Sequence, residues 1–477
     1  MHWRVGHLAV SAAALGLLAG CSLAPRYRTP ATPVPAPAYK ELDGWKLAAP
    51  ADNVPRGPWW QMFHDDDLDA LEARVTSSNE NLKAALARLE EAAAQTRFAR
   101  AGFFPTVTAD ASATRERLSA NAPEFPAGGR TYYNDFVAGG TLSWELDLFG
   151  RIRNTVAGAR ATEQATAGDV AALDLAVHAQ LASDYFMLRG LDAQQELLDH
   201  TVADYAKALE LTENLYHGGA GALSDVEQAQ AQLETARTQA EDTRLHRAQS
   251  EHAIAVLVGQ QASSFSLAAR PLPAALQPPA VDPGLPSQLI ERRPDVAAAE
   301  RRVAAANANI GVARAAYFPD FSLAAAGGWQ SIAQSNWFSA PSRYWSIGPQ
   351  GLLTVFDAGA HAAQAAQAHA AYDEQVAEYR GTVLTAFQDV EDNLAALRQL
   401  QRESVSQAAA VEASQGALDQ ANYRYRGGIV TYLEVVSTEN AALAARLAAL
   451  GIEIQRLTAT VQLVQALGGD WWQGMGR

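Results

Sequence analysis

The sequence predicts a mainly α-helical chain with a β-barrel part, and three observations carry this prediction. All 21 prolines of the 477-residue chain fall into four clusters, which leaves two long stretches free of proline. Segments beside the two central clusters alternate apolar and polar residues with the period of two that strands have. The two halves of the chain also resemble each other in sequence. We therefore expect very long helices joined to a few strands, built as two structural repeats.

The N-terminus has the three-part layout of a secretory signal. Arg4 precedes an apolar run from Leu8 to Leu18, which is too short to span a bilayer securely, and small residues then lead to Cys21. The stretch "LLAGC" resembles the lipobox of bacterial lipoproteins, in which the cysteine becomes the lipidated first residue; the alternative is a cysteine that follows an ordinary signal by chance. We expect a signal peptide at 1–20 and a lipidated, extended segment at 21–65. The lipid on Cys21 is the only prosthetic group expected.

The proline-free stretches, 127–270 and 350–477, are predicted to hold very long helices. A proline inside a helix costs about 3 kcal/mol, and both stretches are rich in Ala, Leu, Gln, Glu and Arg. A helix over 151–216 would be about 100 Å long, since each residue adds about 1.5 Å. So long a helix must be buried along a seam, and the second stretch has apolar residues at the coiled-coil spacing: Val376, Val383, Phe387, Val390, Leu394 and Leu397.

Four segments have the length and the aromatic ends of transmembrane strands, which take roughly 9 to 11 residues. They lie at about 105–118, 132–148, 319–331 and 343–356. In the second of them Phe136, Leu142 and Trp144 share one face. Glu145 and Asp147 fall on the opposite, polar face, so we expect them to line the interior of a barrel.

Four strands cannot close a barrel by themselves, because barrels start at about eight strands and open edges are not tolerated in hydrocarbon. Three chains with four strands each would form a barrel of about twelve strands. The sequence therefore points to a homotrimer with quasi-sixfold symmetry. A soluble antiparallel sheet is the alternative, which the alternation alone does not exclude.

An internal duplication relates the two halves of the chain. "ARAGFFP" from Ala99 pairs with "ARAAYFP" from Ala313, and "DLFGR" from Asp147 pairs with "TVFDA" from Thr354. The predicted repeats cover 66–290, with a long helix at about 151–216, and 291–477, with a long helix at about 358–425. Each repeat is expected to read helix, strand, loop, strand, long helix, glycine break and helix.

The glycine breaks are predicted to be helix stops followed at once by helix starts, at tips over about 216–225 and 425–434. Glycine adopts the positive φ angles that end helices without a side-chain penalty. Each pair of glycines precedes a Ser or Thr with a Glu three residues later, which is the capping-box pattern. The tip-turn glycines are Gly218, Gly219, Gly427 and Gly428, and the capping-box pairs are Ser224 with Glu227 and Thr431 with Glu434.

Composition and motifs exclude several classes of function. The formal net charge of -15, with basic residues scattered among acids, argues against a nucleic-acid partner. The ten histidines are dispersed, and the sequence has no zinc-protease, nucleophile-elbow, Walker or dinucleotide motif, so we expect no enzyme and no metal site. The acidic run "DDDLD" from Asp65 is better explained as an acid-rich helix start than as a calcium loop.

The order of elements resembles the TolC-type outer-membrane factors over nearly the whole mature chain. "WWQMFHDDDLDAL" near residue 60, "RRPDVAAAERRVAAANANIGVARAAYFPDFSL" from Arg292 and "TVFDAGAHAA" from Thr354 resemble the lipoprotein branch that works with resistance-nodulation-division (RND) pumps. This resemblance implies a trimeric, lipid-anchored barrel in the outer membrane, continued by an α-helical coiled-coil tunnel into the periplasm. It also implies a passive conduit that docks on an inner-membrane pump through a periplasmic adaptor.

In that family tyrosine and arginine from the second-repeat tip bind acid and backbone groups of the first-repeat tip, and these links hold the entrance closed. The resemblance places Tyr425 and Asp225 at matching positions, with Arg424 and Arg426 nearby, although Val430 stands where some relatives have a basic residue. The alternative is that Asp225 only stabilises its own helix N-terminus and that Tyr425 packs locally.

Glu434 is a further candidate, since three copies near the axis would form an acidic ring that favours cations. A capping-box glutamate is the alternative explanation of Glu434.

For the whole chain we expect an export duct for drugs or other small molecules. The alternatives are a duct for type I protein secretion and a structural periplasmic coiled-coil lipoprotein.

Overall fold

The computed structural model describes residues 22–32, 40, 58–119, 132–272, 278–279, 281 and 293–469. Cys21 and the predicted signal peptide at 1–20 therefore lie outside the described residues. The chain divides into two compact units. Unit 1 comprises Met1–Ala31, Arg88–Ala167 and Ala298–Tyr379, and unit 2 comprises Thr32–Ala87, Gly168–Ala297 and Arg380–Arg477.

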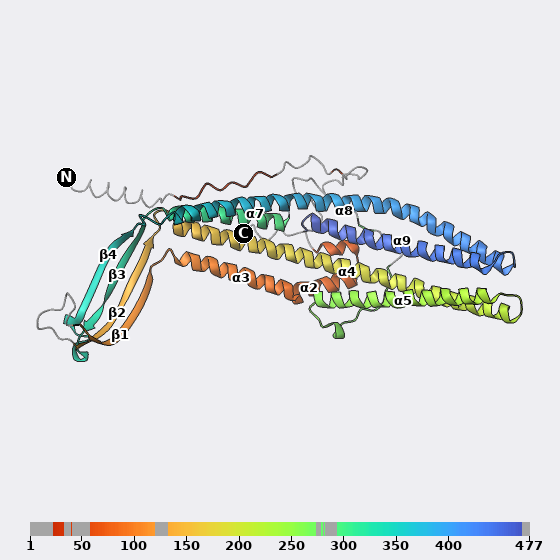
Figure 1. Cartoon of the computed structure of the whole chain (residues 1–477), viewed down its shortest axis with the longest axis horizontal. Coiled ribbons are helices and arrows are strands. Elements are labelled where there is room, and N and C mark those ends of the chain that lie inside the picture. Colours follow the sequence, from red (N-terminus) through yellow and green to blue (C-terminus); the bar gives the residue numbers. More distant parts are fainter. Residues whose placement is uncertain are drawn as a thin grey trace. The chain divides into compact units, whose positions relative to one another are not determined.

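The described elements follow the same order in both halves of the chain (Figure 1). Helices α3 and α7 both have 22 residues, α4 and α8 both have 67, and α5 and α9 both have 35. Such equal lengths are what an internal duplication produces. The first half contains α2 (Asp66–Ser78), α3 (Glu80–Ala101), β1 (Thr106–Arg117), β2 (Tyr132–Leu146), α4 (Arg151–His217) and α5 (Leu223–Leu257). The second half contains α7 (Pro294–Ala315), β3 (Asp320–Ser331), β4 (Arg343–Leu352), α8 (Ala360–Arg426) and α9 (Tyr432–Ala466).

The predicted end of the fourth strand and the predicted course of the N-terminal segment need correction. β4 ends at Leu352, because the chain leaves the sheet there and turns toward the start of α8, so the predicted strand to 356 is four residues too long. The predicted extended segment at 21–65 contains a short 3-10 helix, Trp59–Phe63, whose Phe63 is buried against Phe186 with ring centroids 4.7 Å apart. Burial of that aromatic residue favours a compact turn over an extended course.

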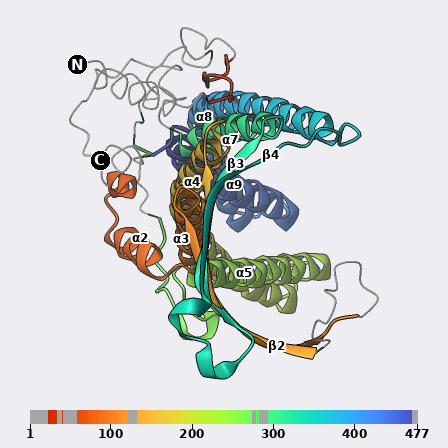
Figure 2. The same cartoon turned by 90° about the vertical axis from the view of Figure 1, so that its left-hand side faces the viewer.

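In unit 1 the four strands form one antiparallel sheet in the order β1, β2, β3, β4, and Figure 2 shows that this sheet is curved. The central pair, β2 with β3, joins strands from the two repeats. The register gives the sheet one apolar face and one polar face. The apolar face carries Val107, Ala111, Phe136, Leu142, Leu323, Trp329, Trp345 and Ile347, and the polar face carries Thr108, Asp110, Thr141, Ser143, Ser322, Gln330, Ser346 and Gln350.

In unit 2 a hydrophobic core lies where α2, α4, α5 and α9 meet. Its members are fully or almost fully buried, among them Leu68, Leu181, Tyr185, Phe186, Ile254, Leu457 and Val461. On α8 the predicted coiled-coil positions Val383, Val390 and Leu394 are also fully buried, which confirms that this face of the helix packs inward.

Helix α2 begins at the acidic run that starts at Asp65, as the sequence predicts. The side chain of Asp65 accepts hydrogen bonds from the backbone N–H groups of Asp67 (3.0 Å) and Leu68 (3.2 Å), so it caps the helix. The phenol of Tyr185 donates a further hydrogen bond to Asp65 over 2.8 Å. The run from Asp65 is therefore a helix start, and it is tied to the core of unit 2.

Candidate functional site

Both hairpin turns of unit 2 end their long helices with the same hydrogen-bond pattern. At the end of α4, Gly219 N–H bonds Tyr216 O (2.9 Å) and Ala220 N–H bonds Leu215 O (2.8 Å). At the end of α8, the Gly428 N–H donates to Tyr425 O and the Ile429 N–H donates to Arg424 O, each over 2.9 Å. This is the Schellman motif, which needs a positive φ at one residue.

The residues with positive φ in these turns are Gly219 (75°) and Gly428 (67°), the second glycine of each pair. The prediction that the glycine pairs end the helices is confirmed. Gly218 and Gly427 are not in the positive-φ region, so only one glycine of each pair is required by the backbone.

The two predicted capping boxes do not form. Helix α5 already begins after Ala222, so Ser224 lies inside its first turn and cannot be the N-cap. Thr431 is the N-cap of α9, but its side chain makes no capping hydrogen bond. Glu434 instead binds Arg424, with 2.7 Å between Arg424 Nη1 and Glu434 Oε1, and this ion pair joins the last turn of α8 to the first turn of α9.

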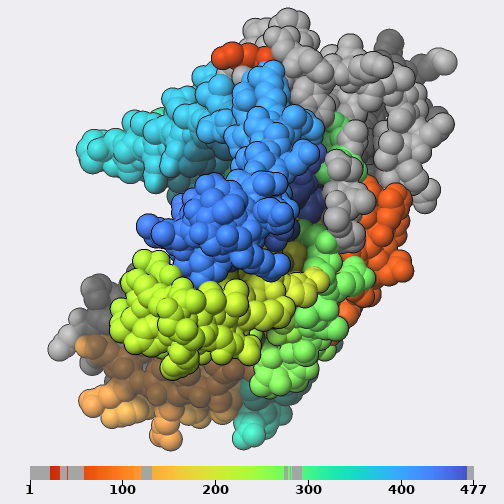
Figure 3. All heavy atoms as spheres, turned by 90° about the vertical axis from the view of Figure 1, so that its right-hand side faces the viewer, coloured from red at the N-terminus to blue at the C-terminus, as the bar shows by residue number. Residues whose placement is uncertain are grey.

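The tip brings Tyr425 close to the first-repeat hairpin. The Tyr425 ring packs on Tyr432 with centroids 5.4 Å apart, in a cluster that also contains Ala229 of α5 and Leu209 of α4. Burial raises the pKa of Tyr425, and the negative charge of Asp225 raises it further. In Figure 3 the tip of α4 and α5 and the tip of α8 and α9 lie beside each other.

The candidate gate residues are thus only partly brought together within one chain. Asp225 acts on Tyr425 electrostatically, but no hydrogen bond joins the two side chains among the described residues. Arg424 is engaged by Glu434. Arg426 is exposed and forms no ion pair with any residue that the structure describes.

Sequence reasoning missed two buried polar groups in the seam behind this tip. Tyr432 is 2% exposed, and its hydroxyl has no hydrogen-bond partner in the described part of the chain. Burial, followed by the charge of Asp204, raises the pKa of Glu439 to about 7, and its Oε2 is likewise buried without a described partner. The only sequence signal for this pair is their spacing of seven residues on α9, which puts them on the same helix face.

The two acids predicted for the barrel interior have different surroundings. Glu145 lies in β2 on the polar face, next to the end of the strand, and its carboxylate binds Arg151, with 2.8 Å between Arg151 Nε and Glu145 Oε1. The strand β2 ends at Leu146, one residue before Asp147. The prediction that Asp147 lies on a strand face is therefore wrong. Its carboxylate accepts hydrogen bonds from the backbone N–H groups of Ile152 and Arg153, both over 2.9 Å.

Asp147 is therefore a cap for the first turn of α4, and the second repeat has an equivalent. Asp357 accepts from the backbone N–H groups of Gly359 (2.9 Å) and His361 (2.7 Å) at the start of α8. The hydrogen bonds from His361 and then Gly359 lower the pKa of Asp357. The chain thus uses an aspartate twice to join a strand to a 67-residue helix.

Replacing Asp147 by alanine is expected to lower the free energy of unfolding by about 1 to 2 kcal/mol, the usual value of an N-terminal cap. The first turn of α4 would lose an acceptor for two backbone donors and a partner for Arg153, whose Nε lies 2.9 Å from Asp147 Oδ2. Denaturation of the purified protein measures this loss. Asp147→Asn keeps one acceptor oxygen and is expected to lose less, whereas equal losses for the two variants would contradict a capping role.

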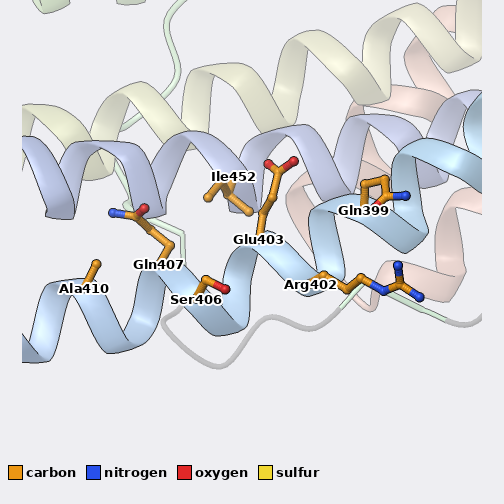
Figure 4. Close-up of a pocket in the computed structure, with 7 residues that line it drawn as sticks. All are labelled: Gln399, Arg402, Glu403, Ser406, Gln407, Ala410 and Ile452. Carbon is orange, nitrogen blue, oxygen red and sulfur yellow. The ribbon is translucent and has the colours of Figure 1, made fainter.

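A polar groove of about 480 Å³ lies along α8 and α9 in unit 2 (Figure 4). Gln399, Glu403 and Gln407 line it on successive turns of α8, and Ile452 contributes from α9. The groove contains no histidine, cysteine or paired carboxylates. Among the described residues no group of three or more His, Cys, Asp or Glu side chains is placed to hold a metal ion.

Comparison with known proteins identifies the family. The family model described as outer membrane efflux protein matches two stretches, 73–260 and 285–469, one in each half of the chain. The toluene efflux pump outer membrane protein TtgC and the antibiotic efflux pump outer membrane protein ArpC, both from Pseudomonas putida, are each 34% identical over 476 residues, which is 98% of this chain and 96% of each relative. The solved structure of the outer-membrane channel OprN superposes with a TM-score of 0.84 at 31% identity and covers 94% of this chain and 99% of that one.

These findings confirm the predicted family, the fold class and the role as the outer-membrane component of an efflux system. Members of this family are channel proteins rather than enzymes. The two matched stretches cover more than three quarters of the sequence and include both long helices and all four strands. The chain belongs to the outer membrane efflux protein family.

Proposed function

We propose that this chain forms the homotrimeric outer-membrane duct of a tripartite efflux system and exports drugs or other small molecules. The observation that carries the proposal is the two-faced sheet, which has unpaired edges at β1 and β4 and continues directly into helices of 67 residues. A sheet with an apolar outer face and a polar inner face suits a barrel wall, but its open edges must be paired with other chains in hydrocarbon.

Exposed apolar groups support this assembly. On the apolar face Val107 is 71%, Trp345 79% and Ile347 64% exposed, which lipid would cover. Among the described helices α9 is long and apolar enough to cross a membrane, yet only 11% of its most apolar window is buried within the chain. Packing against α-helices of other copies would cover this surface without a membrane.

The tips offer a surface for a periplasmic adaptor. Tyr423 is 77%, Ile429 67% and Leu433 58% exposed at the tip of the second repeat, and Leu223 is 51% exposed at the tip of the first. Several exposed apolar groups gathered at the end of a coiled coil suit a contact with another protein. The proposed partners are an adaptor protein and, behind it, an inner-membrane pump of the RND type.

We further propose that Cys21 carries a lipid that anchors the chain at the outer membrane. The residue that follows it, Ser22, donates a hydrogen bond to Asn154 Oδ1 (3.1 Å) at the start of α4, and Asn307 donates one to Pro25 O (3.0 Å). This arm therefore runs beside the junction of β2 and α4, which suits an anchor close to the barrel. In this proposal the lipid and the barrel would hold the chain at the same membrane.

Cross-linking in intact cells followed by affinity capture tests the proposal. We expect a heat-resistant trimer in the outer-membrane fraction, together with an adaptor and an RND-type pump. Capture of an ATP-driven transporter instead would favour the alternative of type I protein secretion. A monomer in the soluble periplasmic fraction would contradict the duct and favour a structural coiled-coil lipoprotein.

The cargo does not follow from similarity, because TtgC and ArpC are equally identical to this chain although their names give toluene and antibiotics. The cargo can be identified by deleting the gene that encodes this chain and measuring the susceptibility of the cells to a panel of antibiotics, solvents and metal ions. We expect increased susceptibility to at least one class of small molecule.

A further inference from the structure

The polar face of the sheet contains a slot formed by two glycines and filled by a tyrosine. The register aligns Asp110, Gly139, Gly328 and Tyr344 in one row across all four strands, on the polar face. In this row the two central residues have no side chain. Tyr344 is half-buried, whereas its neighbour Trp345 on the apolar face is 79% exposed.

The Tyr344 side chain lies flat along the sheet. A methyl group placed on Gly139 would overlap the Tyr344 hydroxyl and would lie 3.4 Å from Tyr344 Cζ. Tyr344 belongs to β4 and Gly139 to β2, and neighbouring strands lie about 4.8 Å apart, so the ring reaches β2 only by crossing β3. Gly328 of β3 is paired with Tyr344 and therefore lies between Tyr344 and Gly139 in this row.

We propose that this slot sets the width of the duct: Gly139 and Gly328 let Tyr344 lie against the barrel wall, and a side chain in the slot would turn the ring into the lumen. The inference rests on the proposed trimeric barrel, in which three copies of Tyr344 would lie at the same level. Pore diameter is a main determinant of which solutes pass, so the slot would set an upper limit on cargo size at the level of this row in the barrel.

The two glycines differ in what a substitution would do. At Gly328 an added Cβ would meet backbone atoms of Ala138 and Gly139, so the strands themselves would have to move. At Gly139 the added Cβ would overlap the far end of the Tyr344 side chain, which can rotate away, and would lie 3.0 Å from the backbone Gly327 O, which would have to give only slightly. Gly139→Ala is therefore the informative variant. Gly348→Ala is its matched control, because Gly348 lies on the same polar face and a Cβ there meets nothing within 4 Å.

Thiol labelling from outside intact cells tests the slot independently of the tips. Ser143 lies exposed on the polar face, nearer than Gly139 to the end of β2 that leads into α4, and Ser143→Cys supplies the reporter in every variant. Cells are treated with a small maleimide or with a maleimide on a polyethylene glycol chain, and a chain without the reporter gives the background from Cys21.

We expect Gly139→Ala to slow labelling by the polymer severalfold while the small reagent reacts at its normal rate. Gly348→Ala is expected to change neither rate, and Gly139→Ala combined with Tyr344→Ala is expected to restore polymer labelling. Heat-resistant trimers at normal level in the outer membrane show that each variant folds. Equal slowing by both glycine variants, or no recovery on removing Tyr344, would overturn the inference. A reporter that the small reagent labels only in broken cells would overturn the proposed barrel, and the slot's function with it.

Discussion

Single-channel conductance is expected to rise severalfold when Asp225 and Tyr425 are both replaced by alanine. Tyr425 packs on Tyr432 of its own hairpin, in a cluster that also contains Ala229 of the first-repeat hairpin, and Asp225 is the nearby charge on the first-repeat tip. Removing both side chains would weaken the packing and the electrostatic interaction between the tips and would let the entrance widen. Recording the purified trimer in planar bilayers measures the change, with entry of a large antibiotic into cells as the second measurement.

Matched controls exist at the same tip. Tyr423 is two residues from Tyr425 but 77% exposed, and Glu227 is an exposed acid two residues after Asp225. The double variant Tyr423→Ala with Glu227→Ala removes the same chemical groups and is expected to leave conductance unchanged. If the first pair also leaves conductance unchanged, Asp225 and Tyr425 do not gate. Asp225 would then only stabilise the start of α5, which is worth about 0.3 to 1 kcal/mol.

The acidic ring proposed at Glu434 must be weighed against its ion pair. Arg424 neutralises the Glu434 carboxylate within one chain, although both side chains remain 41 to 47% exposed. Exposed ion pairs contribute about 0 to 1 kcal/mol and exchange readily with solvent ions. The ring would therefore present three arginine and glutamate pairs to cargo, and its preference for cations depends on how often the pair opens.

Features determined by local geometry could be predicted from the sequence. The helix stops at Gly219 and Gly428 follow from the positive φ that only glycine adopts cheaply, and the cap at Asp65 follows from an acid before a helical run. The residues that share a face of each strand follow from period-two alternation, whereas the pairing between strands does not.

Features that depend on the exact end of an element could not be predicted. Asp147 lies two residues after Glu145, so the alternating pattern places both on the same strand face and predicts that the strand continues through Asp147. In the structure β2 ends at Leu146. Ser224 has the spacing of a capping box, but the Schellman turn after Gly219 is short enough that α5 starts one residue before it. In both cases a neighbouring turn decided which residue caps the helix.

Contacts between distant residues gave no sequence signal at all. Tyr344 and Gly139 are brought together only by the sheet order, which pairs β2 of one repeat with β3 of the other. Glu72 and His178 are 106 residues apart, and nothing in either neighbourhood marks them as a pair. The same pair carries the largest expected effect on stability.

Replacing His178 by leucine is expected to lower the free energy of unfolding by about 3 to 5 kcal/mol. Glu72 is fully buried, and its Oε2 is bonded to Nδ1 of His178, which is 3% exposed. Trp60 covers the imidazole with ring centroids 4.5 Å apart, and Thr76 Oγ1 lies 3.3 Å from Nε2. Without His178 the Glu72 carboxyl would remain buried with no ionic partner, since its Oε1 already lacks one among the described residues.

The double variant Glu72→Leu with His178→Leu is the control for this prediction. Two apolar side chains of similar volume would leave no buried charge, so the double variant is expected to be more stable than the single one. Guanidinium denaturation of the purified protein, followed by circular dichroism, compares the three chains. A double variant no more stable than His178→Leu would show that packing around Trp60, rather than the ionic pair, determines the loss.

The pH dependence of stability gives an independent test of the same pair. Burial alone would lower the pKa of His178, but hydrogen bonds with Asp174 and Glu72 outweigh it and raise the pKa above the usual 6.5. A group whose folded-state pKa is raised contributes stability that is complete below its unfolded-state pKa, and this stability is lost as the pH rises through the folded-state value. Burial likewise raises the pKa of Glu72, despite the opposing hydrogen bond from His178, so its ionisation also costs stability as the pH rises.

We therefore expect the chain to lose stability on going from mildly acidic to alkaline solution. The double leucine variant should lose less over the same range, and an equal loss in both chains would assign the effect to other groups.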